Sequence, residues 1–301
     1  MNTKTKLAVV GCSSMVGSRF CELAGRDFDL LSADFSTDPK IDITDKESVD
    51  NFFQNDFAWL ILFSAFTDVD GAEKQRGDKN GTCWNINVRG VKNIVDACKS
   101  NNRKLIFIST DFVFDGKSSP YSEDDPIGPD LDKVSWYGIT KIEGEKIVQG
   151  LSEFIILRIS YPYRANFPQK EDFAKSILRK YKEGSLYPMF TDQIITPTFI
   201  DDLAPAVSML IRKDLKGVFH LCSPGPTNPY DFAKYLILTF TGKNPDIDKA
   251  KLAELLKEEN VTPRPIKGGM IVEKIAKIGF TPTDWKQGIK TIYEQSSGKL
   301  I

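Results

Sequence analysis

The stretch Leu7-Ala8-Val9-Val10-Gly11-Cys12-Ser13-Ser14-Met15-Val16-Gly17 decides the fold of this chain. Its first four residues form an apolar run typical of a buried strand, and apolar positions three and four apart follow, as in a helix. Gly11 allows a tight turn, and Gly17 allows the helix to pack close to the strand. The N–H groups that begin a helix can bind a pyrophosphate, so a nucleotide is expected to contact Gly11, Ser13, Ser14, Met15, Val16 and Gly17.

This loop is an imperfect dinucleotide fingerprint, because Ser14 stands where many such loops have a glycine. A tight β-α turn without a ligand is the alternative interpretation.

The alternation of apolar runs and helical stretches continues through the first 160 residues, which predicts right-handed β-α-β units and a parallel sheet covered on both faces. We expect strands at Leu7–Val10, Asp29–Ala33, Trp59–Phe63, Leu105–Ser109, Phe154–Leu157 and Gly217–Leu221. Helices are expected near Met15–Ala24, Lys46–Gln54, Thr82–Ser100 and Gly138–Gln149. The predicted fold is an α/β, Rossmann-type, doubly wound parallel sheet with a smaller C-terminal α/β substrate lobe.

The pattern changes after Ile159, where prolines become frequent and helices of mixed length alternate with loops. We therefore expect an NAD(P)-binding domain at residues 1–160 and mainly a substrate-binding lobe at 161–301. Residues 217–222 are expected to return to the sheet and complete it. The polar, lysine-rich stretch Thr241–Glu259 is interpreted as an exposed helix.

The composition of the chain argues against several classes of function. With 27% charged residues and a net charge of −1, the 301-residue chain has an ordinary soluble surface, which predicts no binding to nucleic acid or membranes. Residues 1–11 lack the pattern of a signal peptide, so we expect a cytoplasmic protein with reduced cysteines. The single histidine, His220, is interpreted as a packed strand residue, and no metal site is predicted.

An acidic residue follows the second expected strand. Asp34 lies about twenty residues beyond the glycine loop, where a carboxylate can accept hydrogen bonds from the adenosine ribose. No Arg or Lys adjoins it in the sequence, which favours NAD over NADP, although an ordinary strand-end turn is the alternative. Asp42 and Ile43 are expected to border the adenine, and Thr44 or Asp45 to cap the next helix.

The strongest constellation is Tyr137-Gly138-Ile139-Thr140-Lys141, with Thr110 at the end of an upstream strand. A spacing of four residues places Tyr137 and Lys141 on one face of a helix. The phenol has an ordinary pKa of about 10, which a nearby cation lowers. Thr110 can donate a second hydrogen bond to a carbonyl oxygen, so Thr110, Tyr137 and Lys141 are predicted to catalyse hydride transfer to a carbonyl.

These residues and their flanks resemble the extended short-chain dehydrogenase/reductase superfamily, and most closely its dTDP-4-dehydrorhamnose reductase family. The stretch Ile108–Gly116 (ISTDFVFDG) is similar to the family's I-S-T-D-Y-V-F-D-G almost letter for letter. The stretches 64–73, 87–90, 157–161 and 192–198 follow other family segments, so the likeness covers nearly the whole chain.

The resemblance implies further site residues. Cofactor contacts are implied for Ser64, Ala65, Thr67, Asn87, Tyr137 and Lys141, and substrate contacts for Thr110, Asp111, Tyr161, Gln193, Thr196 and Thr198. The chain departs from the family on the substrate side: Tyr161 replaces a tryptophan, Ile195 replaces a glycine, and the serine of R-P-x-x-S is missing after Arg264. The nucleotide and the sugar are therefore left open.

The implied function is NAD(P)H-dependent reduction of a 4-keto-6-deoxyhexose on a nucleoside diphosphate, as in dTDP-rhamnose biosynthesis. A nucleotide-sugar epimerase on the same scaffold is one alternative. A dehydratase would have an acidic pair after the active-site threonine, where this chain has Asp111 and then Phe112. A non-catalytic NAD(P)-binding subunit, like the regulatory beta subunit of methionine adenosyltransferase, is the alternative of another class. The sequence leaves the oligomeric state open and is compatible with a homodimer.

Overall fold

The computed structural model describes residues 4–300 and contains a six-stranded parallel sheet with the strand order β2-β1-β3-β4-β5-β7. The strands are β1 (Thr5–Val10), β2 (Phe28–Ala33), β3 (Trp59–Leu62), β4 (Lys104–Thr110), β5 (Phe154–Ile159) and β7 (Gly217–His220). The predicted doubly wound sheet is therefore confirmed. The strand order reverses at β1, because β2 lies on one side of it and β3 on the other, and such a switch point is where α/β sheets bind ligands.

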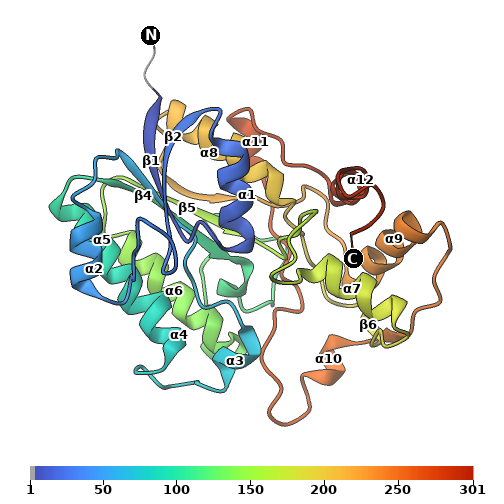
Figure 1. Ribbon diagram of the computed structural model, residues 1–301. Coiled ribbons are helices and arrows are strands. Elements are labelled where there is room, and N and C mark those ends of the chain that lie inside the picture. The colour runs from blue at the N-terminus through green and yellow to red at the C-terminus, as the bar shows by residue number, and fades with distance from the viewer. Residues whose placement is uncertain (1–3, 301) are drawn as a thin grey trace.

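Helices cover both faces of the sheet (Figure 1). In the first half of the chain they are α1 (Met15–Ala24), α2 (Lys46–Phe52), α3 (Val69–Glu73), α4 (Thr82–Trp84), α5 (Val91–Ser100) and α6 (Trp136–Val148). In the second half they are α7 (Phe173–Lys182), α8 (Leu203–Arg212), α9 (Pro229–Thr241), α10 (Leu252–Leu255), α11 (Glu273–Lys277) and α12 (Trp285–Gln295). Short 3-10 turns lie at η2 (Asp111–Val113), η3 (Leu131–Lys133) and η4 (Ile200–Asp202).

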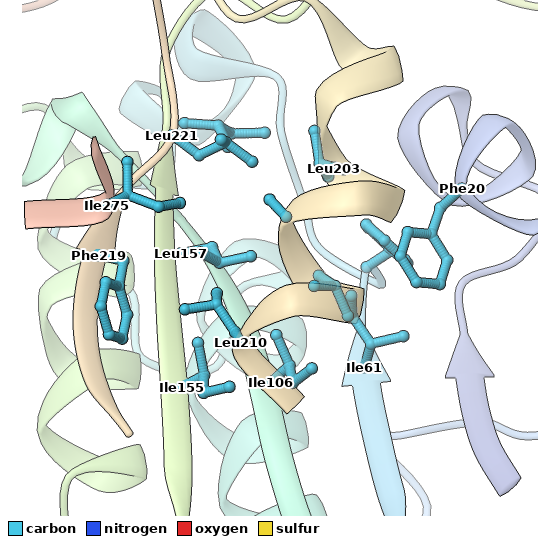
Figure 2. Packing of buried hydrophobic residues seen from close by; sticks show 14 of the residues in the cluster. Phe20, Ile61, Ile106, Ile155, Leu157, Leu203, Leu210, Phe219, Leu221 and Ile275 are labelled. Carbon is cyan, nitrogen blue, oxygen red and sulfur yellow. The ribbon is translucent and has the colours of Figure 1, made fainter. Parts of the chain in front are cut away.

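The strands are apolar on both sides because each face of the sheet is buried by helices. On one face, side chains of β3, β4 and β5 pack against α1 and α8, and Figure 2 shows Leu203 and Leu210 of α8 beside Ile106, Ile155 and Leu157. The opposite face packs against α2, α5 and α6 in a second cluster of buried residues. Helices thus cover both faces of the parallel sheet, and the carboxyl ends of its strands lie along one edge.

A third hydrophobic cluster joins the helices α7, α9 and α12, which lie to one side of the sheet in Figure 1. Beside them, β6 (Met189–Phe190) pairs in parallel with β8 (Lys249–Ala250). From the second half of the chain, β7 joins the sheet, and residues of α8 and α11 belong to the cluster on its face. The division into domains at residue 160 stays a prediction.

Two helix predictions need correction. The expected helix Thr82–Ser100 is interrupted by the π-helical turn η1 (Asn85–Gly90), which separates α4 from α5. The exposed helix expected at Thr241–Glu259 is wrong: α9 ends at Thr241, and Pro245 follows, which cannot continue a helix. That segment instead contains β8 and the single turn α10. Asp45, rather than Thr44, caps α2.

His220 is fully buried in β7, as its apolar flanks predicted. Its Nδ1 lies 3.1 Å from the carbonyl oxygen of Ile271, and its Nε2 lies 3.3 Å from a guanidinium nitrogen of Arg158. Burial, together with the charge of Arg158, lowers the pKa of His220 to about 3. The ring is therefore neutral and structural at physiological pH. Across residues 4–300, every helix is too short or too polar to span a membrane.

Candidate active site

A cavity of about 960 Å³ lies at the carboxyl ends of β1, β3 and β4. One end is lined by the glycine loop after β1, and the other by the residues that follow β4 and β5. The predicted site residues that line it are Gly11, Ser13, Ser14, Met15, Val16, Asp34, Asp42, Ile43, Ser64, Ala65, Thr67, Thr110, Asp111, Tyr137, Lys141 and Tyr161. A volume of this size is in the range of cofactor and ligand sites, which are roughly 300–1,000 Å³.

The loop at residues 11–17 has the geometry of an anion-binding turn. Gly11 has φ +89°, and a Cβ there would lie 2.5 Å from the backbone nitrogen of Ser64. Gly17 does not line the cavity but permits the close approach of α1, because a Cβ on it would collide with the carbonyl oxygen of Gly11. Ser14 caps α1 by accepting from the N–H of Gly17. The first turn of a helix has N–H groups without intrahelical acceptors, and Met15 and Val16 of that turn face the cavity.

Asp34 holds this loop in place. Its Oδ2 accepts hydrogen bonds from the backbone N–H of Ser13 at 3.0 Å and from the Ser13 hydroxyl at 2.5 Å. Its Oδ1 accepts from the N–H of Phe35 at 2.7 Å, which leaves a lone pair on that oxygen. Asp34 therefore lines the cavity as expected, with one oxygen available to a ribose hydroxyl.

Two residues near Asp34 were not predicted from the sequence as part of the site. The ring of Phe35 is 60% exposed and lines the cavity. The ammonium of Lys40 lies 4.7 Å from the centre of this ring. Asp34 and Lys40 form a parallel β-bridge, so the backbone brings Lys40 beside Asp34 from six positions away in the sequence.

Catalytic candidates meet at the other end of the cavity. Thr110 ends β4, and its hydroxyl donates to Asp111 Oδ1 at 3.1 Å and accepts from the N–H of Phe112 at 3.2 Å. Tyr137 and Lys141 come from the first half of α6, which Ser135 caps. All four polar side chains, of Thr110, Asp111, Tyr137 and Lys141, are buried in the wall of the cavity.

The charge pattern differs from the one that the sequence suggested. Burial raises the pKa of Tyr137, and the nearby Asp111 raises it further, so the expected lowering by Lys141 is not found. The ammonium of Lys141 donates to the carbonyl oxygen of Ile108 at 2.8 Å and lies 3.9 Å from the ring centre of Phe107. Burial lowers the pKa of Lys141 to about 7, because desolvation outweighs the attraction of other groups. Tyr137 therefore keeps its proton near neutrality.

Asp111 has an unusual environment for a carboxylate. It is 1% exposed, and burial raises its pKa to about 7, although the hydroxyls of Ser160 and Thr110 donate to it. Between pH 4 and 7, the folded protein thus holds a proton that the unfolded chain releases. Ionising the buried carboxyl of Asp111 lowers the free energy of unfolding. This loss of stability is fully present above pH 7 and absent below pH 4.

Replacing Asp111 with asparagine should therefore stabilise the protein more at high pH than at low pH. Relative to the unmodified protein, the free energy of unfolding should increase by on the order of 1–4 kcal/mol between pH 4 and pH 8, since one pKa unit corresponds to about 1.4 kcal/mol. Urea unfolding of both proteins at several pH values measures this. Parallel stability curves would show that the Asp111 pKa is near its ordinary value.

Four predicted site residues do not line the cavity besides Gly17. Asn87 is buried behind the loop after β3, where its side chain bonds both backbone groups of Phe66, at 2.8 and 3.0 Å. Thr196 accepts from the N–H of Met270, and Thr198 accepts from the N–H of Ser160. Gln193 is also buried and reaches the cavity wall through the hydroxyl of Tyr161. These residues brace the walls of the cavity in the structure.

The mouth of the cavity carries two cations that were not predicted. The ammonium of Lys170 donates to the hydroxyl of Thr67 at 3.0 Å, and the guanidinium of Arg264 donates to Asp70 at 2.7 Å. Both cations line the cavity, and both come from segments of the second half of the chain. Arg264 stood in a recognisable motif, whereas nothing in the local sequence distinguishes Lys170.

Comparison with known proteins identifies the family of this chain and its relatives. Residues 5–297 match the family described as the RmlD substrate binding domain. A dTDP-4-dehydrorhamnose reductase of Aggregatibacter actinomycetemcomitans is 29% identical over 306 residues, covering 95% of this chain and 98% of the relative. The dTDP-4-dehydrorhamnose reductase of Bacillus anthracis, solved in complex with NADP, has a TM-score of 0.85 and 26% identity, covering 97% of this chain and 100% of that one. An enzyme of the same name from Clostridium acetobutylicum has a TM-score of 0.83 and 28% identity, with the same coverage.

Proposed function

Because the chain belongs to the RmlD substrate binding domain family, we propose that it reduces a 4-keto-6-deoxyhexose carried on a nucleoside diphosphate, with NAD(P)H as the reductant. The observation that carries this proposal is the single cavity that joins the glycine loop at Gly11 to the polar cluster of Thr110, Tyr137 and Lys141. Such a cavity can hold a dinucleotide along one side and present a carbonyl group to proton donors at its end.

The residues of the chain have separate tasks in this reaction. When bound, the nicotinamide cofactor supplies the hydride that reduces the carbonyl carbon. The carbonyl oxygen gains negative charge at that moment, and Tyr137 donates its proton to it. The raised pKa of the phenol suits this direction, because Tyr137 is protonated at neutral pH. When the substrate binds, the hydroxyl of Thr110 turns its hydrogen away from Asp111 and donates a second hydrogen bond to the same oxygen.

The nucleotide part of the substrate requires cations at the mouth of the cavity. Lys170 and Arg264 lie there with exposed partners, Thr67 and Asp70, which a diphosphate can replace as ligands. Arginine and lysine are the side chains that most commonly bind phosphate oxygens. We therefore assign the diphosphate to Lys170 and Arg264, and the sugar to the space between them and Thr110.

A substrate panel tests this function. dTDP-, UDP- and GDP-linked 4-keto-6-deoxyhexoses should be incubated with NADH or NADPH, and cofactor oxidation followed by absorbance. We expect oxidation with the dTDP-linked ketone, because that is the substrate named for the relatives. Cofactor binding without oxidation of any of the three would contradict the proposal and favour a binding subunit. Interconversion of nucleotide sugars without net oxidation would favour an epimerase.

For the cofactor, we propose that NADH binds at least as tightly as NADPH. Asp34 presents a carboxylate oxygen where the adenosine ribose would lie, and a 2′-phosphate there would meet a like charge. Lys40 is the opposing influence, because its ammonium lies beside Phe35. The balance of the two is measurable.

Fluorescence titration with both reduced cofactors at one ionic strength gives the two dissociation constants. We expect the NADH constant to be equal to or lower than the NADPH constant. A clear preference for NADPH would overturn this prediction. In that case the variant Lys40→Met should lose the preference if Lys40 neutralises the additional phosphate.

A further inference from the structure

Tyr161 has a strained backbone at the edge of the active site. Its φ is +41°, in the left-handed region that aromatic residues seldom adopt, and Pro162 follows it directly. Such strain persists only where the surrounding structure holds it, and it is found disproportionately at functional sites. The strain at Tyr161 therefore indicates a functional role for its side chain.

The turn brings Tyr161 beside the catalytic cluster. It follows β5, where Ile159 is the register partner of Thr110 on β4. Ser160 lies between Ile159 and Tyr161 in the sequence, and its hydroxyl donates to Asp111 Oδ2 at 2.8 Å. The ring of Tyr161 packs edge-on against Phe173, with 5.1 Å between the ring centres, and lines the cavity together with Thr110 and Asp111. Thr110 and Tyr161 thus line the same cavity from the ends of two adjacent strands, where one substrate can contact both.

Gln193 determines how the hydroxyl of Tyr161 can bond. The side chain of Gln193 is 3% exposed, and its Nε2 lies 3.3 Å from the carbonyl oxygen of Pro265 and 3.0 Å from the oxygen of Tyr161. A carbonyl oxygen can only accept, so the amide nitrogen has to face Pro265, and the same nitrogen donates to Tyr161. The tyrosine oxygen is then an acceptor toward Gln193, and its own hydrogen remains to be donated. Within residues 4–300, no acceptor takes that hydrogen.

We propose that Tyr161 donates this hydrogen to the sugar of the substrate, at the hydroxyl on the carbon next to the carbonyl, and that Gln193 is a positioning residue that acts through Tyr161. The proposal rests on the proposed function and narrows it, since it requires a ketone with a neighbouring hydroxyl group. Gln193 has no contact of its own with the substrate in this arrangement.

The variant Tyr161→Phe removes one oxygen and keeps the ring against Phe173. With the dTDP-linked 4-keto-6-deoxyhexose, KM should rise about 3- to 10-fold, as expected for one neutral hydrogen bond. The dissociation constants of NADH and of dTDP alone should stay within twofold, because neither contains the sugar. Tyr293→Phe removes a hydroxyl from a half-exposed tyrosine of α12 outside the cavity and is the matched control. An unchanged KM in Tyr161→Phe would overturn the proposal.

Two further comparisons identify the partners of the hydroxyl. A substrate deoxygenated at the carbon next to the carbonyl should show the same KM with the unmodified enzyme and with Tyr161→Phe. Gln193→Leu should raise KM in the unmodified background and add nothing in the Tyr161→Phe background. Additive effects would place Gln193 in direct contact with the substrate and overturn its role as a positioning residue. If Gln193→Leu does not fold, the comparison of the two substrates still tests the contact between Tyr161 and the sugar.

The two proposals fail in different ways. If the unmodified protein oxidises no reduced cofactor with any keto sugar, the proposed function fails, and the role of Tyr161 fails with it. If the unmodified protein turns the dTDP-linked ketone over and Tyr161→Phe matches its KM, only the role of Tyr161 is lost.

Discussion

Replacing Tyr137 with phenylalanine should lower kcat by about 10²- to 10⁴-fold, the range expected when a general acid is removed. In the proposed reaction the buried phenol donates the proton, and phenylalanine retains the ring that packs edge-on against Phe112. Binding of the cofactor should change little, because the cavity keeps its shape. Steady-state kinetics with the keto sugar and a titration with NADH give the two quantities.

In the unmodified enzyme, deprotonation of Tyr137 should not lower kcat for reduction at any pH up to 10. Burial and the charge of Asp111 raise the pKa of this phenol above its ordinary value, so the proton is present throughout that range. Near-normal turnover by Tyr137→Phe on a verified substrate would show that another group supplies the proton.

Replacing Lys141 with methionine should weaken cofactor binding and lower turnover together. We propose that its ammonium holds the ribose next to the nicotinamide, and a hydrogen bond from a charged group contributes about 1.5–3 kcal/mol. The dissociation constant of NADH should therefore rise roughly 10- to 100-fold. Methionine is chosen because it is unbranched, like lysine, and fills the buried space beside Phe107 without a charge.

The pH dependence distinguishes this role from a loss of packing. Since the pKa of Lys141 is lowered to about 7, the free protein has the cation below pH 7 and loses it as the pH rises. The affinity of the unmodified protein for NADH should fall as the pH increases through 7, and Lys141→Met should not show that change. Lys146→Met, at an exposed position of the same helix, is the control. Equal losses in both variants would exclude a specific role for Lys141.

The sequence was informative where one local stretch determines a local geometry. Residues 7–17 predict a strand, a glycine turn and a helix, and all three form as expected. Tyr137 and Lys141 share a helix, so their spacing was enough to place them together. Alternation of apolar runs likewise predicted each strand of the large sheet, because a strand buried on both faces has a continuous apolar sequence.

Contacts between distant segments were not predictable in the same way. Lys40 approaches Phe35 through a β-bridge, and Lys170 approaches Thr67 across the cavity; neither contact has a signature in the local sequence. The pKa of Lys141 depends on how deeply α6 is buried, which spacing along a helix does not reveal. The hydrogen bond from Gln193 to the hydroxyl of Tyr161 likewise joins distant segments, and the expected contact of Gln193 with substrate stays a prediction.

The two hydrogen-bonded pairs at the mouth of the cavity affect how fast a ligand can bind. Lys170 with Thr67 and Arg264 with Asp70 each join a side chain from the second half of the chain to a loop or helix beside the sheet. Lys170 is exposed and Arg264 partly exposed, and side chains at the surface rotate in picoseconds to nanoseconds, whereas hinge motions of whole domains take microseconds to milliseconds. Under the proposed assignment, both pairs can open without movement of the backbone, and an arriving diphosphate provides the new partner for each cation. The negative charge of the ligand should then speed its association with these cations, and the rate of association should decrease as salt screens that charge.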